Sequence, residues 1–172
     1  SSVGSIFMDY RSSSDLSGFH TIVYGHRMRN GTMFVSLKYY DQQSCREAYS
    51  HFCIVNGGGT YVYEIFSAYD AGVTDDTYHH SFADDREKQA FLDFCTGQSV
   101  ISTETVPTVE DCTLPISTCT GQGHATRWVS GGGTCLNALK NGVSQMRYAI
   151  FSLFQHIQQR QQFIGHLAPR GT

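Results

Sequence analysis

The feature that most constrains the fold is a glycine-rich turn at residues 56–59, Asn-Gly-Gly-Gly. Two strand-like segments flank it, at residues 52–55 and 60–69, and the longer one alternates between two faces, as a half-buried strand does. A turn of this composition between two such segments is a strong β-hairpin signal. The expected framework is therefore an antiparallel sheet built around this hairpin.

Further short segments with strand character are separated by polar turns. They lie at residues 5–10, 20–24, 113–118 and 126–130. Helices are expected at 44–51 and 85–96, the second with Asp84 as N-cap, Glu87 in a capping box and Gly97 after its last turn. Many short strands and few helices predict a mainly β fold, a closed or nearly closed β-barrel with short helices in its connections.

The last quarter of the chain follows a different pattern. Glycines at 131–133 break the strand pattern, and apolar residues recur at helical spacing over residues 143–164. We therefore expect a barrel over residues 1–135 and a helical extension or tail over residues 136–172, with a possible C-terminal helix. The apolar stripe of that segment fits docking on the barrel, contact with a partner, or a poorly ordered tail.

Charge and hydropathy limit the classes of partner. The net charge is −3 and no basic stripe is present, so a nucleic-acid partner is not expected. No apolar run reaches the ~20 residues of a membrane helix, and no signal peptide opens the chain. The first residues read like the middle of a protein, which leads us to expect a missing upstream segment.

The six cysteines show no metal-binding pattern. None forms a Cys-x-x-Cys pair, and no Cys/His spacing fits a structural zinc site. On a strand, the adjacent His79 and His80 would point to opposite faces, which disfavours a metal site at Tyr78-His79-His80. No metal and no cofactor are expected, and most of the cysteines are interpreted as small buried side chains.

Three residue types suited to acyl transfer lie at the ends of predicted strands. His26 follows one strand, Cys119 ends another and Arg127 begins the next. A nearby cation favours the nucleophilic thiolate form of a cysteine. A histidine can protonate a leaving amine and deprotonate an incoming one, and a guanidinium can hydrogen-bond an oxyanion. Each residue alone is more often structural, so residue types by themselves make this site one hypothesis among several.

The sequence around these residues closely resembles the class B sortases of Gram-positive bacteria. Four segments and Arg127 carry the resemblance: residues 4–11 (GSIFMDYR), 21–34 (TIVYGHRMRNGTMF), 63–69 (YEIFSAY) and 117–120 (STCT). The resemblance extends over about residues 4–129 and implies the sortase β-barrel fold.

The resemblance also implies a role for each site residue. Cys119 is implied to be the nucleophile, His26 the general acid/base and Arg127 the clamp for the oxyanion and the substrate. Ser117 and Thr118, in the motif that ends at the cysteine, are implied to contact the substrate. The resemblance implies no metal and no cofactor.

The implied reaction is transpeptidation. A C-terminal sorting signal would be cleaved after Thr through a thioacyl-enzyme, and the protein passed to an amine of the cell wall or a pilin. The implied location is the extracellular face of the cell membrane, with an N-terminal anchor that this chain lacks. Two alternatives stay open: a non-catalytic barrel that only binds peptides, and a cysteine peptidase that only hydrolyses them.

One departure from the family concerns the strand that carries Cys119. The family motif usually reads Leu-Ser-Thr-Cys, whereas here Leu114-Pro115-Ile116 precedes Ser117. Because proline lacks a backbone N–H donor, this strand is expected at a sheet edge or with a bulge at Pro115.

Overall fold

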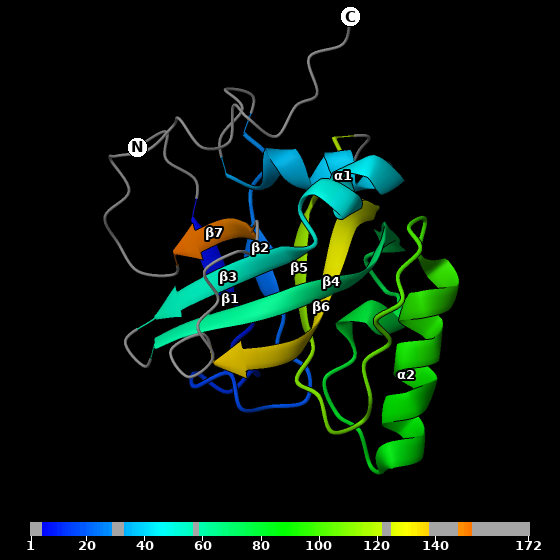
Figure 1. The fold of residues 1–172 in the computed structure, drawn as a ribbon. Helices are drawn as coiled ribbons and strands as arrows, with labels where there is room; N and C mark the ends of the chain where they lie inside the picture. The colour runs from blue at the N-terminus through cyan, green and yellow to red at the C-terminus, as the bar shows by residue number, and fades with distance from the viewer. Residues whose placement is uncertain (1–4, 29–32, 57–58, 122–124, 138–147, 153–172) are drawn as a thin grey trace, which may run out of the picture.

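The computed structural model describes residues 5–28, 33–56, 59–121, 125–137 and 148–152. Strands and short helices follow one another along the chain (Figure 1). In order, they are β1 (Ile6–Met8), β2 (Val23–Gly25), η1 (Phe34–Asp41), α1 (Gln43–Ala48), β3 (His51–Asn56), β4 (Gly59–Gly72), η2 (Asp76–Tyr78), α2 (Asp85–Gln98), β5 (Leu114–Cys119), β6 (Thr126–Asn137) and β7 (Tyr148–Ser152).

The strands of the described residues form one curled sheet in the order β1-β2-β5-β6-β4-β3-β7. Neighbouring strands are antiparallel except at β2–β5 and β3–β7, which are parallel. Helix α2 lies along one side of the sheet, and η1 and α1 lie over one end (Figure 1). The predicted mainly β fold with short helices in its connections is confirmed; over the described residues the sheet is a half-barrel with β1 and β7 at its edges.

Two apolar clusters pack on the two faces of this sheet. One contains the buried Val23, Phe34 and Ile116. The other lies against α2 and contains Phe91 and Val129. Because successive residues of a strand face opposite sides, β4 and β6 contribute to both clusters. Each fully buried side chain of this size contributes about 1.5–3 kcal/mol.

The predicted hairpin and the predicted longer helix are both confirmed. Strands β3 and β4 are antiparallel, with Asn56 opposite Gly59. At the start of α2, the Asp84 carboxylate accepts a hydrogen bond from the Glu87 backbone N–H at 2.9 Å, and the Glu87 carboxylate accepts one from Ala83 N–H at 2.7 Å. Reciprocal capping of this kind satisfies donors that the first helical turn leaves unpaired.

The glycines at 131–133 do not break the strand, contrary to the expectation. Strand β6 continues through them to Asn137, paired with β4. A Cβ added at Gly131 would lie 2.5 Å from Ser67 Oγ, and one added at Gly132 would lie 2.5 Å from the Phe52 ring. The glycines therefore allow a close approach between β6 and its neighbours, a packing reason that the local sequence pattern does not reveal.

Strand β5 is neither an edge strand nor bulged, so that expectation was wrong. It lies between β2 and β6, and its pairing with β6 runs without a register shift from Leu114 to Cys119. On the side of β2, parallel pairs lie before and after Pro115, His20 with Thr113 and Val23 with Ile116. The sheet thus accommodates the proline between these two pairs without a bulge.

The helix expected over residues 143–164 is contradicted where the structure describes that segment. Residues 148–152 form β7, which pairs in parallel with β3, so that His51 is opposite Tyr148 and Val55 is opposite Ser152. The backbone there is extended because pairing with the edge of β3 outweighs the helical spacing of the apolar residues. The rest of the predicted helix lies outside the described residues.

The close packing of β6 gives a stability prediction. Gly132→Ala is expected to lower the free energy of unfolding by about 1–3 kcal/mol, because the added methyl overlaps the Phe52 ring and Tyr63 Cβ. Gly97→Ala is the matched control: nothing lies within 4 Å of its added Cβ, and the helical position favours alanine by up to ~1 kcal/mol. Urea unfolding of both variants measures the difference, and equal stabilities would contradict the packing argument.

Candidate active site

The parallel pairing of β2 with β5 brings His26 and Cys119 to the same end of the sheet. Tyr24 is opposite Ser117 in this register. His26 comes two residues after Tyr24, and Cys119 two residues after Ser117. Since parallel strands run in the same direction, both side chains follow their paired residues at the same strand ends. Residues far apart in the sequence are thereby brought together.

Arg127 is on the other side of β5, directly across from Cys119. The two residues are register partners in the antiparallel β5–β6 pair. Side chains opposite each other in such a pair have Cβ atoms about 4.5–5.5 Å apart and lie on the same face. His26 has the same alternation as Cys119 through the Tyr24–Ser117 pair. The register therefore pairs Cys119 with Arg127 on one sheet face, and His26 follows β2 at the same end of the sheet.

Backbone contacts fix the loop that contains His26. The Phe34 N–H donates to the His26 carbonyl at 3.2 Å. A Cβ on Gly25 would lie 2.4 Å from the Phe34 ring, so glycine is needed where the chain leaves β2. Arg27 donates from its guanidinium to the backbone carbonyl of Thr120. The residue after His26 is thus joined to the residue after Cys119.

The three residues differ in their exposure to solvent. The His26 side chain is exposed, whereas Cys119 and Arg127 are partly buried. One Arg127 nitrogen donates to the Thr126 carbonyl at 3.0 Å, which helps to orient the guanidinium at the start of β6. A partly buried thiol opposite a guanidinium, with an imidazole at the same strand end, has the components that acyl transfer to a cysteine requires.

The structure places the two predicted substrate-contacting residues on different faces. Ser117 is buried on the face of Cys119, where its hydroxyl is hydrogen-bonded to the Tyr78 hydroxyl at 3.0 Å. Thr118 is buried on the opposite face, where it is the register partner of Trp128. The Thr118 side chain therefore belongs to the core side of β5.

Tyr78 is the site residue that sequence reasoning missed, having considered it only beside two histidines as a metal site. It ends η2 and packs over the face that carries Ser117. Burial raises the pKa of Tyr78, while the Ser117 hydrogen bond and the charge of Arg127 lower it and the Cys119 thiolate raises it. The Ser117 hydrogen bond places the phenol beside the strand that ends at Cys119. In the sequence, Tyr78 is simply a tyrosine that follows two polar residues, Asp76 and Thr77, and that pattern does not indicate a site residue.

The segment before Tyr78 is held by buried groups. His20 Nε2 donates to the Thr77 carbonyl at 3.0 Å, and the Tyr69 hydroxyl is hydrogen-bonded to Thr77 Oγ1 at 3.1 Å. Burial lowers the pKa of His20 to about 3, so its imidazole is neutral at neutral pH. Thr77 is thereby held by two buried side chains, and these contacts fix the position of the backbone just before Tyr78.

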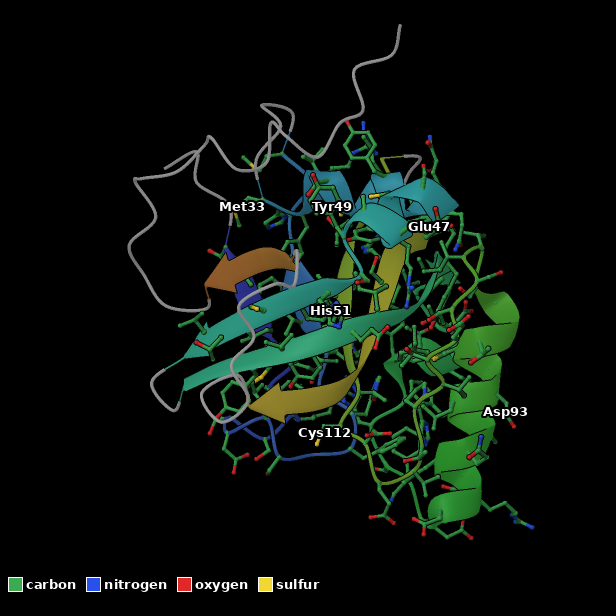
Figure 2. The ribbon with its side chains drawn as sticks, viewed as in Figure 1. Met33, Glu47, Tyr49, His51, Asp93 and Cys112 are labelled. Carbon is green, nitrogen blue, oxygen red and sulfur yellow. The ribbon has the colours of Figure 1, made fainter. Side chains whose placement is uncertain are left out.

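The other described cysteines lie in surroundings that disfavour the thiolate. Burial raises the pKa of Cys45 and of Cys53 to about 11 and that of Cys95 to about 12. Burial also raises the pKa of Cys112. Figure 2 shows Cys112 at the end of the sheet opposite to Tyr49 and Glu47, which belong to the region of α1. Among the cysteines that the structure describes, Cys119 is the one at the strand end beside His26 and opposite Arg127.

Two further observations concern the part of the chain that the structure describes. It contains no group of three or more His, Cys, Asp or Glu side chains placed to hold a metal ion. None of its helices has the length and apolar character needed to cross a membrane.

Comparison with known proteins yields relatives of one kind. Sortase B of Staphylococcus aureus is 37% identical over 116 residues, which cover 67% of this chain and 48% of that protein. The chain therefore spans about half the length of the curated relatives that it matches. No family model matches the chain.

Two solved structures share the fold. A Staphylococcus aureus sortase B–substrate complex has a TM-score of 0.69 and 32% identity, over 77% of this chain and 62% of that one. Sortase B from Listeria monocytogenes has a TM-score of 0.66 and 30% identity, over 74% of this chain and 71% of that one. The curled sheet described above is thus a sheet that these enzymes also contain.

The contrast among the cysteines gives a chemical prediction. At about pH 7.5, iodoacetamide is expected to modify Cys119 before Cys45, Cys53, Cys95 and Cys112, because the thiolate is the reacting form. For Cys45 and Cys53, the rise in pKa from 9.0 to about 11 leaves roughly 100-fold less thiolate. Timed alkylation followed by peptide mapping measures the order. Modification of any of these four ahead of Cys119 would contradict the prediction.

Proposed function

The chain belongs to the class B sortases, and we propose that it acts as a cysteine transpeptidase with Cys119 as the nucleophile. In this proposal His26 is the general acid/base, and Arg127 holds the oxyanion and the substrate. The observation that carries the proposal is the register of β5, which aligns Cys119 with Arg127 on one side and with the strand before His26 on the other.

The first half-reaction forms a thioacyl-enzyme. The Cys119 thiolate attacks the carbonyl carbon of the Thr residue in a sorting signal, and the carbonyl π electrons move onto oxygen. Collapse of this tetrahedral intermediate breaks the C–N bond, and protonated His26 gives its proton to the departing amine. The products are a thioester on Cys119, a released C-terminal peptide and a neutral imidazole.

The second half-reaction reverses these roles. An amine attacks the thioester carbonyl while neutral His26 accepts its proton, and the Cys119 thiolate leaves as the new amide bond forms. Arg127 stabilises the oxyanion in both steps, a contribution that commonly amounts to about 3 kcal/mol. A guanidinium suits this role because it stays charged and offers several donors in a fixed plane.

The substrate classes follow from the family and the site. The proposed donor is a sorting-signal peptide, and the Staphylococcus aureus relative of similar structure was solved as a sortase B–substrate complex. Ser117 and Tyr78, which are hydrogen-bonded beside Cys119, are proposed to border the bound peptide. Thr118 is proposed to contribute through its backbone, since its side chain faces the core.

The acceptor and the location are further parts of the proposal. An amine of the cell wall or of a pilin would accept the acyl group, at the extracellular face of the cell membrane. Release of the thioester to water would make the protein a hydrolase, and absence of any thioester would make it a peptide-binding barrel. One experiment separates these three outcomes.

Mass spectrometry of the protein mixed with candidate sorting peptides, with and without an added amine, tests the proposed reaction. We expect an acyl adduct on Cys119 and an amide product that depends on the amine. Cys119→Ala is expected to abolish both, because no other described thiol lies at this site. Cys112→Ala, a partly buried thiol just before the same strand, is the matched control and should keep them. Cleavage by Cys119→Ala would refute the assignment, and product formed only by hydrolysis would refute the transferase.

Arg127 provides a separate prediction. Arg127→Lys is expected to lower kcat/KM for peptide cleavage roughly 100-fold, because a point-like ammonium cannot reproduce the planar guanidinium at the oxyanion. Arg86→Lys, at an exposed position of α2, is the matched control with the same chemical change. Steady-state kinetics of both variants decide the point, and a loss below about threefold for Arg127→Lys would remove it from the oxyanion site.

A further inference from the structure

A buried carboxylate lies just after β1, on a segment that the mechanism does not use. Asp9 is 9% exposed, and its two oxygens accept hydrogen bonds from two residues. Oδ1 accepts from the backbone N–H of Arg11 at 3.0 Å and from its Nε at 2.9 Å, and Oδ2 accepts from Arg11 Nη2 at 3.1 Å and from the Tyr24 hydroxyl at 3.2 Å. His80 Nε2 lies 3.4 Å from Oδ2, without hydrogen-bond alignment.

The partners of Asp9 come from three separate parts of the chain. Arg11 is two residues away, and its side chain is 47% exposed, so this ion pair by itself contributes little to stability. Tyr24 lies in β2 and His80 follows η2. The carboxylate therefore connects the edge strand of the sheet with the strand before His26 and with the segment that begins at Tyr78.

Tyr24 contacts both Asp9 and Tyr78, and so connects the carboxylate with the candidate active site. Its ring stacks on Phe7 at 5.3 Å between centroids and on Tyr78 at 6.3 Å, with an angle of only 15° between the two tyrosine planes. Tyr78 in turn is hydrogen-bonded to Ser117 on the strand that carries Cys119. Burial raises the pKa of Tyr24, as does the charge of Asp9, so its hydroxyl stays protonated and donates to the carboxylate.

We propose that Asp9 is a positioning residue: by holding the Tyr24 hydroxyl it fixes the stacked Tyr24 and Tyr78 rings, and so the Tyr78 hydroxyl beside Ser117 and Cys119. This inference rests on the proposed function, because it assigns Asp9 to the peptide-binding side of that site. Asp9 does not touch the reacting atoms.

The contacts of η2 separate this role from general stability. The backbone of η2 is anchored at Thr77 by hydrogen bonds from His20 and with Tyr69 that do not involve Asp9. The direction of the Tyr78 ring depends instead on the Tyr24 stack and the Ser117 hydrogen bond. Loss of the Asp9 carboxylate therefore leaves the η2 backbone in place and releases the ring, which affects peptide binding more than the thiol chemistry.

The test uses Asp9→Asn and Tyr24→Phe in the full chain, with peptide cleavage as the kinetic readout. Both variants should raise KM roughly 3- to 10-fold, the size expected for one disturbed hydrogen bond at a binding site, and should change kcat by less than about twofold. The rate of Cys119 alkylation by iodoacetamide, which needs no peptide site, should stay unchanged. Asp15→Asn is the matched control, since among the described residues Asp15 is hydrogen-bonded to Ser13 and Ser17 of its own turn.

A double-mutant cycle determines whether Asp9 acts through Tyr78. If it does, Asp9→Asn raises KM much less in a Tyr78→Phe background than in the wild type, because the hydroxyl that it positions is already gone. Equal fold-changes in the two backgrounds would overturn the proposal. So would an unchanged KM in both Asp9→Asn and Tyr24→Phe, or a parallel loss of Cys119 alkylation.

A readout that needs no activity keeps the inference separate from the proposed function. With ¹³C-labelled tyrosine, Asp9→Asn should shift the ring signals of Tyr24 and Tyr78 and leave that of Tyr40, whose hydroxyl bonds to the Tyr49 carbonyl, in place. If Asp9→Asn does not fold, Tyr24→Phe replaces it and the Tyr78 signal alone is followed, because that variant has no tyrosine at position 24. If the wild type cleaves no peptide, the proposed function fails while the ring signals still decide the positioning role. An unshifted Tyr78 signal would overturn it.

Discussion

The candidate active site depends on the short parallel pairing between β2 and β5. Two residue pairs make it, Val23 with Ile116 and Tyr24 with Ser117. Parallel neighbours need a long crossover, and here the segment from η1 to α2 provides it. A slip of one residue would turn Ser117 into the core and Ile116 out of it. The buried Val23 and Ile116 oppose such a slip, so core packing holds His26 and Cys119 at the same strand ends.

Successive residues of β5 face opposite sides of the sheet, so one side of the strand packs in the core and the other faces the candidate site. Leu114 and Ile116 lie fully buried in the core, whereas Ser117 and Cys119 occupy the other side. Two buried polar groups near the site lack hydrogen-bond partners among the described residues. They are the hydroxyl of Thr118 and the indole N–H of Trp128, its register partner. Buried polar groups without partners destabilise a fold. The burial of Leu114 and Ile116 offsets that destabilisation, and Cys119 lies at the end of the same strand.

Sequence patterns predicted what local physics determines. The β3–β4 hairpin, the capping box of α2 and the strand ends at Cys119 and Arg127 depend on neighbouring residues, and the structure contains them. The expectations for glycines 131–133 and, within the expected C-terminal helix, for residues 148–152 were wrong because tertiary contacts overrode local preference. Gly132 continues a strand because Phe52 occupies the space of a side chain, a contact between distant segments that spacing cannot predict.

The same distinction explains why Tyr78 and Asp9 were not selected as site residues. Tyr78 belongs to a three-residue helical turn, too short to fix a side chain by its own backbone hydrogen bonds. Its position comes from three elements: Ser117 on β5 binds its hydroxyl, Tyr24 on β2 stacks on its ring, and His20 holds the preceding carbonyl. Asp9 is joined to this arrangement by the hydrogen bond that it accepts from the Tyr24 hydroxyl. The proposed reacting groups lie at strand ends, whereas the residues proposed to border the peptide are positioned by buried polar and aromatic contacts between segments that meet only in the folded chain.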